Sequence, residues 1–242
     1  MYNIKWLLDK NDVHNDYTVP RLVSYPRTGS HWLRMMLELS LGCPSYVQSF
    51  FDEAPTSCWG LHIHNRRSDN SKHPEGPVVG LKKVIYLYRD PVDTIYSNLK
   101  YERILDRNWN GNASLELHEG VNRLVSEYKR HLHRWMINND DVESFMPLTY
   151  EDLKRDAQGS LTKISEFLNA SVCQDRILES IARCDKSLTK RLTPHDKQAL
   201  NSEHIDGGST YTDNREKFKS LFGNHIESKF SEVLMSISTK YK

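Results

Sequence analysis

The sequence has few cysteines and none at the spacing of a metal or disulfide motif. Its four cysteines, at positions 43, 58, 173 and 184, stand far apart, with no Cys-x-x-Cys and no cluster of cysteine with histidine. This pattern argues against a disulfide framework and a zinc site. It is typical of a chain with reduced thiols, and we expect a cytoplasmic protein.

Long apolar runs are also lacking. No stretch approaches the ~20 apolar residues that a membrane-spanning helix needs. The first residues meet a charge at Lys5 and another at Asp9, so they lack the apolar core of a signal peptide. We therefore expect no membrane partner.

The sequence has no excess of either charge. Lys and Arg number 33 against 32 Asp and Glu, a net charge of +1. This balance argues against a broad nucleic-acid surface, which needs many unneutralised cations, but it permits a local anion site. The 242 residues show no repeat and no low-complexity linker, so we expect one domain over residues 1–242.

Short apolar runs alternate with segments of helical periodicity. Strands are predicted over 22–25, 59–63, 84–88 and 145–150. Helices are predicted after a cap at Ser30, after Asp90 and Pro91, and over 115–137, 161–168 and 216–237. A flexible loop is predicted at 206–209. Strands that alternate with helices indicate an α/β fold, with a central parallel sheet covered by helices on both faces.

Two strand-to-helix junctions carry polar residues. In such a sheet, ligands bind beyond the carboxyl ends of the strands. The first junction, residues 24–32, holds a Gly-containing turn whose free N–H groups suit an anion, with Arg27, Thr28 and Ser30 beside it. By itself this stretch is equally compatible with an ordinary strand–turn–helix connection.

The second junction places Arg89 at the end of a strand and Ser97 two turns into the next helix. Taken alone, Arg-Asp-Pro is a common helix entry. Two such junctions on one sheet indicate a ligand with two phosphate-like groups.

These residues resemble those of the sulfotransferases that use 3′-phosphoadenosine 5′-phosphosulfate (PAPS). The family's 5′-phosphosulfate loop reads Tyr-Pro-Lys-Ser-Gly-Thr-Thr-Trp, and Tyr25–Trp32 reads Tyr-Pro-Arg-Thr-Gly-Ser-His-Trp. Arg89 and Ser97 are similar to the 3′-phosphate motif, and Tyr150 begins a Tyr-Glu-Asp-Leu-Lys stretch whose Tyr touches adenine in the family. The resemblance covers about residues 20–170 and implies a fold related to the P-loop nucleotide kinases.

The resemblance also implies the cofactor, its ligands and a mechanism. The cofactor would be PAPS, with adenosine 3′,5′-bisphosphate (PAP) as product and no metal. The implied ligands are Arg27, Thr28, Gly29, Ser30, His31, Trp32, Arg89, Ser97 and Tyr150. The general base of in-line transfer would be His64, with His62 in the position of a family Lys and His31 as a further candidate. A His-x-His pair is also compatible with two surface or metal-binding histidines.

The sequence departs from the family in two places. Arg27 replaces the usual Lys, and a guanidinium stabilises charge without acting as a general acid. The C-terminal Arg-Lys-Gly loop is only faintly echoed at 207–214, so extra contacts to the 3′-phosphate would come from residues such as Arg215, Lys217, Lys190 or Arg191.

The sequence leaves the acceptor and the reaction class partly open. The acceptor is a small molecule or a saccharide bearing a hydroxyl or amine, with Phe50, Phe51, Trp59 and Trp109 as candidates for its pocket. One alternative is a P-loop kinase, although Gly-x-x-x-x-Gly-Lys-[Ser/Thr] is absent. Another is a non-catalytic binder of PAP.

Overall fold

The structure, a computed structural model, describes residues 20–42, 64–67, 81–105, 109–184 and 209–241. Four parallel strands form one sheet in the order β2-β1-β3-β4: β1 (Arg21–Ser24), β2 (His64–Arg67), β3 (Leu81–Tyr88) and β4 (Val142–Thr149). The helices are α2 (Ser30–Leu41), α3 (Pro91–Tyr101), α4 (Leu115–Leu132), α5 (Tyr150–Arg155), α6 (Ala157–Phe167), α7 (Gln174–Arg183) and α10 (Ser209–Lys240), and η1 (His133–Ile137) is a π-helical turn.

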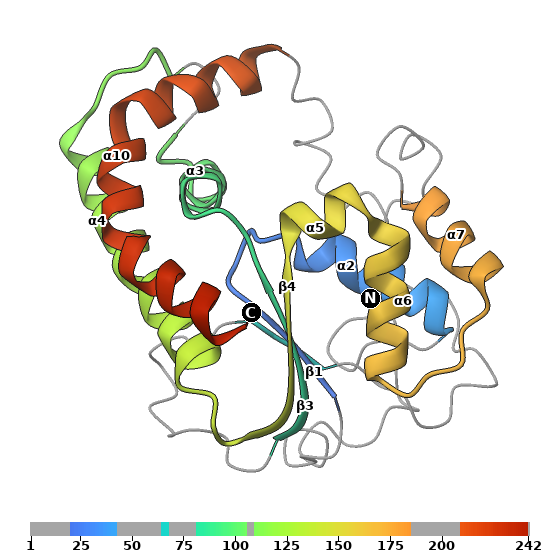
Figure 1. The fold of residues 1–242 in the computed structure, drawn as a ribbon. Helices are drawn as coiled ribbons and strands as arrows, with labels where there is room; N and C mark the ends of the chain where they lie inside the picture. Colours follow the sequence, from blue (N-terminus) through green and yellow to red (C-terminus); the bar gives the residue numbers. More distant parts are fainter. Residues whose placement is uncertain (1–19, 43–63, 68–80, 106–108, 185–208, 242) are drawn as a thin grey trace, which may run out of the picture.

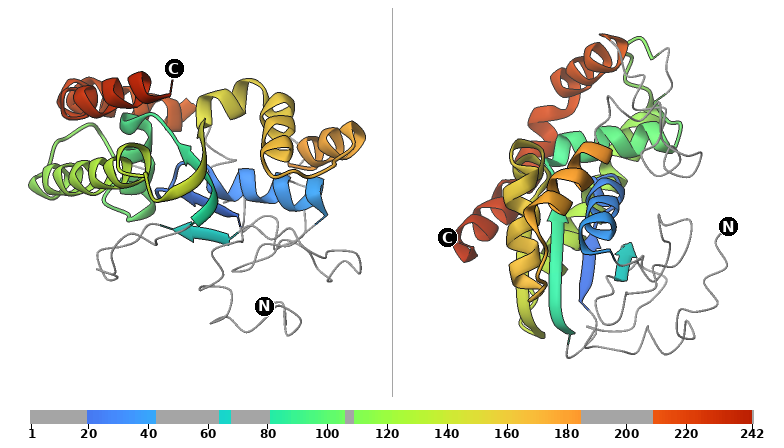
Figure 2. Two further views of the ribbon diagram at one scale, coloured as in Figure 1. Left: turned by 60° about the horizontal axis from the view of Figure 1, so that its bottom comes forward. Right: turned by 90° about the vertical axis from the view of Figure 1, so that its right-hand side faces the viewer.

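Helices cover both faces of the sheet, as Figures 1 and 2 show, with α3, α4 and α10 on one side and α2, α6 and α7 on the other. Side chains alternate between the faces along a strand. Val84 and Tyr86 of β3 therefore pack with α3, α4 and α10, whereas Ile85 and Leu87 pack with α2, α6 and α7. The predicted parallel α/β architecture is confirmed.

The long helix α10 completes the core on one face. An apolar stripe at helical spacing faces α3 and α4, and its members are Phe218, Phe222, Ile226, Phe230, Val233 and Ile237. All six side chains are buried. The helix therefore buries the core on the side of the sheet that carries α3 and α4, although it is distant in sequence from the strands.

Several predicted boundaries are wrong. Ser30 is the first helical residue rather than the cap, because Gly29 occupies the cap position with a φ of 97°. The last helix begins at Ser209 and not near 216, and positions 206–208 of the predicted loop lie outside the described residues. The predicted helix 115–137 is one continuous segment, but its last turn is π-helical, and Asn138 N–H donates to the carbonyl of His133.

Of the remaining predictions, one is confirmed, one concerns residues outside the described ranges, and one is not tested. The Asp90 cap is confirmed, since the Asp93 N–H donates to its side chain and Pro91 follows at the first helical position. The predicted strand at 59–63 lies outside the described residues, and β2 begins at His64. The single-domain prediction for 1–242 stays a prediction.

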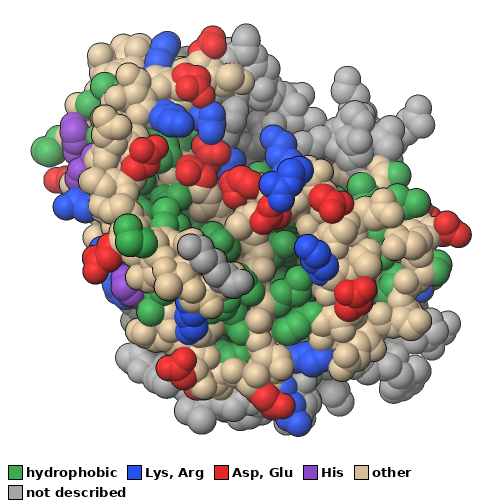
Figure 3. All heavy atoms as spheres, in the orientation of Figure 1, with side chains coloured by type: hydrophobic (Ala, Val, Ile, Leu, Met, Phe, Trp, Pro, Cys, Tyr) green, Lys and Arg blue, Asp and Glu red, His purple; other side chains and the backbone are tan. Residues whose placement is uncertain are grey.

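The surface agrees with the balanced composition. On the face seen in Figure 3, basic and acidic side chains are interspersed rather than separated by sign. Within the described ranges, no helix is both long and apolar enough to cross a membrane.

We expect Phe230→Ala to destabilise the protein by about 3–5 kcal/mol, because it leaves a cavity under a fully buried ring of α10. Met235→Ala on the same helix is the control, since Met235 is 69% exposed and its loss should change stability by under about 0.5 kcal/mol. Urea denaturation measures both. Equal losses for the two variants would show that α10 does not close the core.

Candidate functional site

The first junction turns sharply between β1 and α2. Arg27 has a φ of 69° and Gly29 a φ of 97°, so two residues adopt the left-handed conformation within three positions. Such a conformation is costly for a residue with a side chain. The Thr28 hydroxyl donates to the carbonyl of Tyr25 at 2.7 Å and closes the turn. That hydroxyl proton is committed to the turn, so Thr28 offers an anion its backbone N–H.

The turn delivers the N-terminus of α2 to the sheet edge. The cap residue Gly29 has no side chain to bond the first turn of α2, whose early N–H groups include those of Ser30, His31 and Trp32. The positive end of the helix dipole therefore lies at this junction. The ring of Tyr150 lies against Gly29, and Trp32 meets the same ring edge-on, with centroids 5.9 Å apart.

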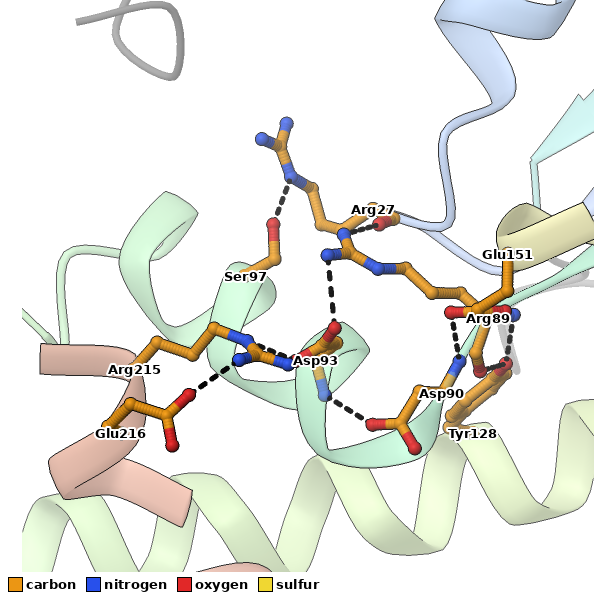
Figure 4. Close-up of polar contacts among 9 residues, drawn as sticks. All are labelled: Arg27, Arg89, Asp90, Asp93, Ser97, Tyr128, Glu151, Arg215 and Glu216. Carbon is orange, nitrogen blue, oxygen red and sulfur yellow. Dashed lines mark hydrogen bonds and ion pairs between the residues drawn. The ribbon is translucent and has the colours of Figure 1, made fainter. Parts of the chain in front are cut away.

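The second junction lies directly beside the first. β1 and β3 pair in parallel with Ser24 opposite Leu87, so the two strands end at the same level. Arg27 Nε donates to the Ser97 hydroxyl at 3.3 Å, and Arg89 Nη1 donates to the Arg27 carbonyl at 3.4 Å. Figure 4 shows these side chains gathered over the start of α3. The structure thus brings together both predicted sets of anion-binding residues.

A carboxylate that the sequence analysis missed organises this group. Asp93 Oδ1 accepts from Arg215 Nε at 2.6 Å, and its Oδ2 accepts from Arg89 Nη2 at 3.4 Å. In Figure 4 the two guanidinium groups reach Asp93 from different elements, α10 and the end of β3. Arg215 also pairs with Glu216 at 2.7 Å. The spacing of Arg89 and Asp93, four residues apart at a helix start, is the only sequence signal for this pair.

The Arg89 side chain has unused hydrogen-bonding capacity. Its Nε is buried and has no partner among the described residues. Its guanidinium carbon lies 4.6 Å from the centre of the Tyr150 ring. An arginine held by an aromatic ring, one long ion pair and one long bond to a carbonyl, with a donor left over, fits an anion such as a phosphate.

Tyrosines and a histidine lie beneath the two junctions. Tyr25 stacks on Tyr128 with ring centroids 4.7 Å apart, and Tyr86 hydrogen-bonds His131 Nδ1 at 2.7 Å. Burial lowers the pKa of His131 to about 3, so this imidazole is neutral near pH 7. Burial and the neighbouring Glu127 raise the pKa of Tyr25, so its hydroxyl stays protonated.

The two histidines predicted as base candidates lie in β2 or just before it in sequence. His62 lies outside the described residues. His64 begins β2 and pairs with Arg21, whereas Ser24 at the end of β1 pairs with Arg67. At a rise of about 3.3 Å per residue, the His64 backbone lies roughly 10 Å before the level at which β1 ends. The assignment of His64 as base stays a prediction.

Two further predictions concern metals and the acceptor pocket. Among the residues that the structure describes, no three His, Cys, Asp or Glu side chains are placed to hold a metal ion. Trp109 donates its indole N–H to the Asn112 carbonyl at 2.8 Å and packs against the core. Phe50, Phe51 and Trp59 lie outside the described residues.

The chain resembles known proteins in sequence. A family model described as the sulfotransferase domain matches residues 80–237. Sulfotransferase 2A6 of Mus musculus is 24% identical over 204 residues, which cover 69% of this chain and 66% of the relative. The 3-alpha-hydroxysteroid sulfotransferase of Cavia porcellus is 27% identical over 187 residues, covering 66% and 61%. The chain therefore spans about three fifths to two thirds of the length of these relatives.

It also resembles solved structures. The crystal structure of mouse sulfotransferase SULT7A1 complexed with PAP has a TM-score of 0.62 at 18% identity, covering 93% of this chain and 88% of that one. Retinol dehydratase in complex with androsterone and inactive cofactor PAP has a TM-score of 0.57 at 14% identity, covering 90% and 81%. These likenesses confirm the fold that the sequence predicted.

We expect Gly29→Ala to destabilise the protein more than Gly111→Ala. Both glycines have a φ near 98°, so each alanine costs about 1–2 kcal/mol in backbone strain. A Cβ at position 29 would also lie 2.5 Å from the Tyr150 ring, whereas the nearest described atom to a Cβ at 111 is Lys217 Cδ at 3.7 Å. Thermal unfolding measures the difference. Equal melting temperatures for the two variants would show that Tyr150 does not lie over the turn.

Proposed function

The chain belongs to the sulfotransferase family, and we propose that it transfers a sulfuryl group from PAPS to a hydroxyl or amine of a small acceptor. The observation that carries the proposal is the meeting of the two junctions, with Arg27 against Ser97 and Arg89 against the Arg27 carbonyl. A nucleotide with phosphates at both its 3′ and 5′ positions needs two adjacent anion sites. PAP is the ligand named for both solved structures above.

The residues present fit such a nucleotide. The N-terminal N–H groups of α2 and the Arg27 guanidinium suit the 5′ group, and Arg89 with Ser97 suits the 3′-phosphate. Tyr150 and Trp32 offer aromatic surface for adenine next to Gly29. When bound, PAPS supplies the sulfuryl group that moves in line to the acceptor.

Arg27 has a defined role in this proposal. A guanidinium stays charged and does not act as a general acid, because it does not release its protons in proteins. It would stabilise the negative charge that grows on the leaving phosphate, together with the N–H groups of the turn. Its Nε bond to Ser97 at 3.3 Å fixes it over α3 before any ligand arrives.

Arg215 replaces part of the basic loop that the sequence lacks. It lies near the start of α10 and shares the Asp93 carboxylate with Arg89, so it places a second cation beside Arg89, the proposed ligand of the 3′-phosphate. We assign Arg215 to the same phosphate as Arg89.

The base is proposed on the sequence resemblance. A neutral imidazole near pH 7 suits removal of the acceptor proton, and His64 occupies the matching place in the sequence. His62 stands two positions earlier in the same stretch, and the backbone of His64 pairs with Arg21. The two histidines are therefore compared directly below.

The acceptor proposed is a small hydroxyl-bearing or amine-bearing molecule, including a saccharide. The name of the Cavia porcellus relative and the androsterone of the retinol dehydratase complex favour a ring-bearing alcohol. We propose as well that the enzyme is cytoplasmic and that its reaction needs no metal.

We expect PAP to bind about 10-fold or more tightly than AMP, because a charge-assisted contact to the 3′-phosphate is worth about 1.5–3 kcal/mol. Arg89→Ala should remove most of this preference. Arg134→Ala is the matched control. Arg134 pairs with Asp141 just before β4 begins, so it lies near the amino end of that strand, whereas the site lies at the carboxyl ends of β1 and β3. Titration calorimetry of each protein with both nucleotides gives the ratios.

Equal affinities for PAP and AMP in the wild-type chain would overturn the assignment. Transfer from radiolabelled PAPS to a panel of alcohols and amines then separates an enzyme from a non-catalytic binder of PAP. Mg²⁺-dependent phosphate transfer from ATP would instead indicate a kinase.

We expect His64→Ala to abolish turnover and to leave the Kd for PAP unchanged, because a base meets the acceptor and not the nucleotide. His62→Ala should be the milder variant. The measurement is initial transfer rate at saturating PAPS together with calorimetry of PAP. A reversed order would assign His62 as the base, and two active variants would place the base in another segment.

A further inference from the structure

The backbone of Arg89 is held by a side chain from another element. β3 ends at Tyr88, whose partner in the sheet is Thr149, so Arg89 lies beyond the paired strand. The Tyr128 hydroxyl of α4 accepts from the Arg89 N–H at 3.1 Å and donates to the Arg89 carbonyl at 2.7 Å. One hydroxyl thus satisfies both backbone groups of a residue outside the ladder. Figure 4 shows Tyr128 beneath this segment.

The same side chain also contacts the other junction. The Tyr128 ring is fully buried and stacks on Tyr25, which opens the turn that carries Arg27. It also meets the ring of Phe230 of α10, with centroids 5.5 Å apart. Burial raises the pKa of the Tyr128 hydroxyl, so this group keeps the proton that it donates.

We propose that Tyr128 is a positioning residue that fixes Arg89 and thereby sets the preference for a 3′-phosphorylated nucleotide. The inference rests on the proposed function. We do not expect Tyr128 to contact the ligand, because its side chain is fully buried and its hydroxyl bonds the backbone N–H and carbonyl of Arg89. Its effect passes through the position of one guanidinium.

Glu151 acts on the next residue in a similar way, but more weakly. Its carboxylate accepts from the Asp90 N–H at 3.3 Å, and that contact is exposed. A solvent-exposed contact is readily replaced by water. The buried Tyr128 hydroxyl has no such substitute, so it is the residue to test.

The test is Tyr128→Phe, which keeps the ring and removes only the hydroxyl. We expect the Kd for PAP to rise about tenfold while the Kd for AMP changes by less than about twofold. Tyr86→Phe is the matched control, because it also removes a fully buried hydroxyl, bonded to His131 and to neither junction. Its ratio of PAP to AMP affinity should stay at the wild-type value, whatever happens to its melting temperature.

A double-mutant cycle checks the route of the effect. If Tyr128 acts through Arg89, Tyr128→Phe has no further effect on the PAP affinity of the Arg89→Ala protein. Equal weakening of PAP and AMP by Tyr128→Phe, or an additive effect in the cycle, would overturn the proposal and leave Tyr128 a core residue only.

A measurement without nucleotide separates this inference from the proposed function. Hydrogen exchange of the Arg89 amide should be faster in Tyr128→Phe than in both the wild type and Tyr86→Phe, at temperatures where all three are folded. A wild-type chain that does not prefer PAP overturns the proposed function, and the exchange result still decides whether Tyr128 holds Arg89. Unchanged exchange at Arg89 overturns the positioning role itself.

Discussion

The site depends on the parallel pairing of β1 with β3. With Ser24 opposite Leu87, the chain leaves both strands at one level and on one edge of the sheet. Each strand then feeds a helix, so two helix N-termini and two arginines lie next to one another. A shift of this register by one residue would reverse the face of every side chain on β1, because the strand alternates between two different cores. Packing on both faces therefore fixes the geometry of the polar group at the edge.

Three guanidinium groups stand close together here, and the structure offsets their repulsion in several ways. Asp93 is shared between Arg89 and Arg215, and Glu216 pairs with the latter. Aromatic rings take part as well, since the guanidinium of Arg27 lies 5.1 Å from the centre of the Tyr101 ring. Arg215 is held at 2.6 and 2.7 Å, whereas the hydrogen bonds of Arg27 and Arg89 named above are longer, at 3.3 and 3.4 Å.

The sequence predicted the parts of the site whose structure is local. The Asp90–Pro91 helix start, the β-prone run before Tyr25 and the Gly29 turn each depend on neighbouring residues, and all are present. Alternating strands and helices were enough for the fold class. The left-handed φ of Arg27 was not predictable, because a residue with a side chain adopts it only where the surrounding structure requires it.

Contacts between distant segments could not be predicted in the same way. Arg215 meets Asp93 across 122 positions, and Tyr128 meets Arg89 across 39. Both depend on how α10 and α4 dock, which side-chain periodicity does not specify. The register of β2 against β1 is a similar case, since no turn or cap in the sequence signals that His64 pairs with Arg21.

The placement of α10 has a consequence for biosynthesis. Its apolar stripe, Phe218 to Ile237, packs with α3 and α4 over one face of the sheet. Two strands of that sheet, β1 and β3, are translated more than a hundred residues before α10. Until that helix docks, Tyr96 lacks its contact with Phe218, Tyr128 lacks Phe230, and Asp93 lacks Arg215. A nascent chain at that stage exposes apolar side chains that are buried in the folded protein. The residues that contact α10 therefore stay uncovered until this helix docks.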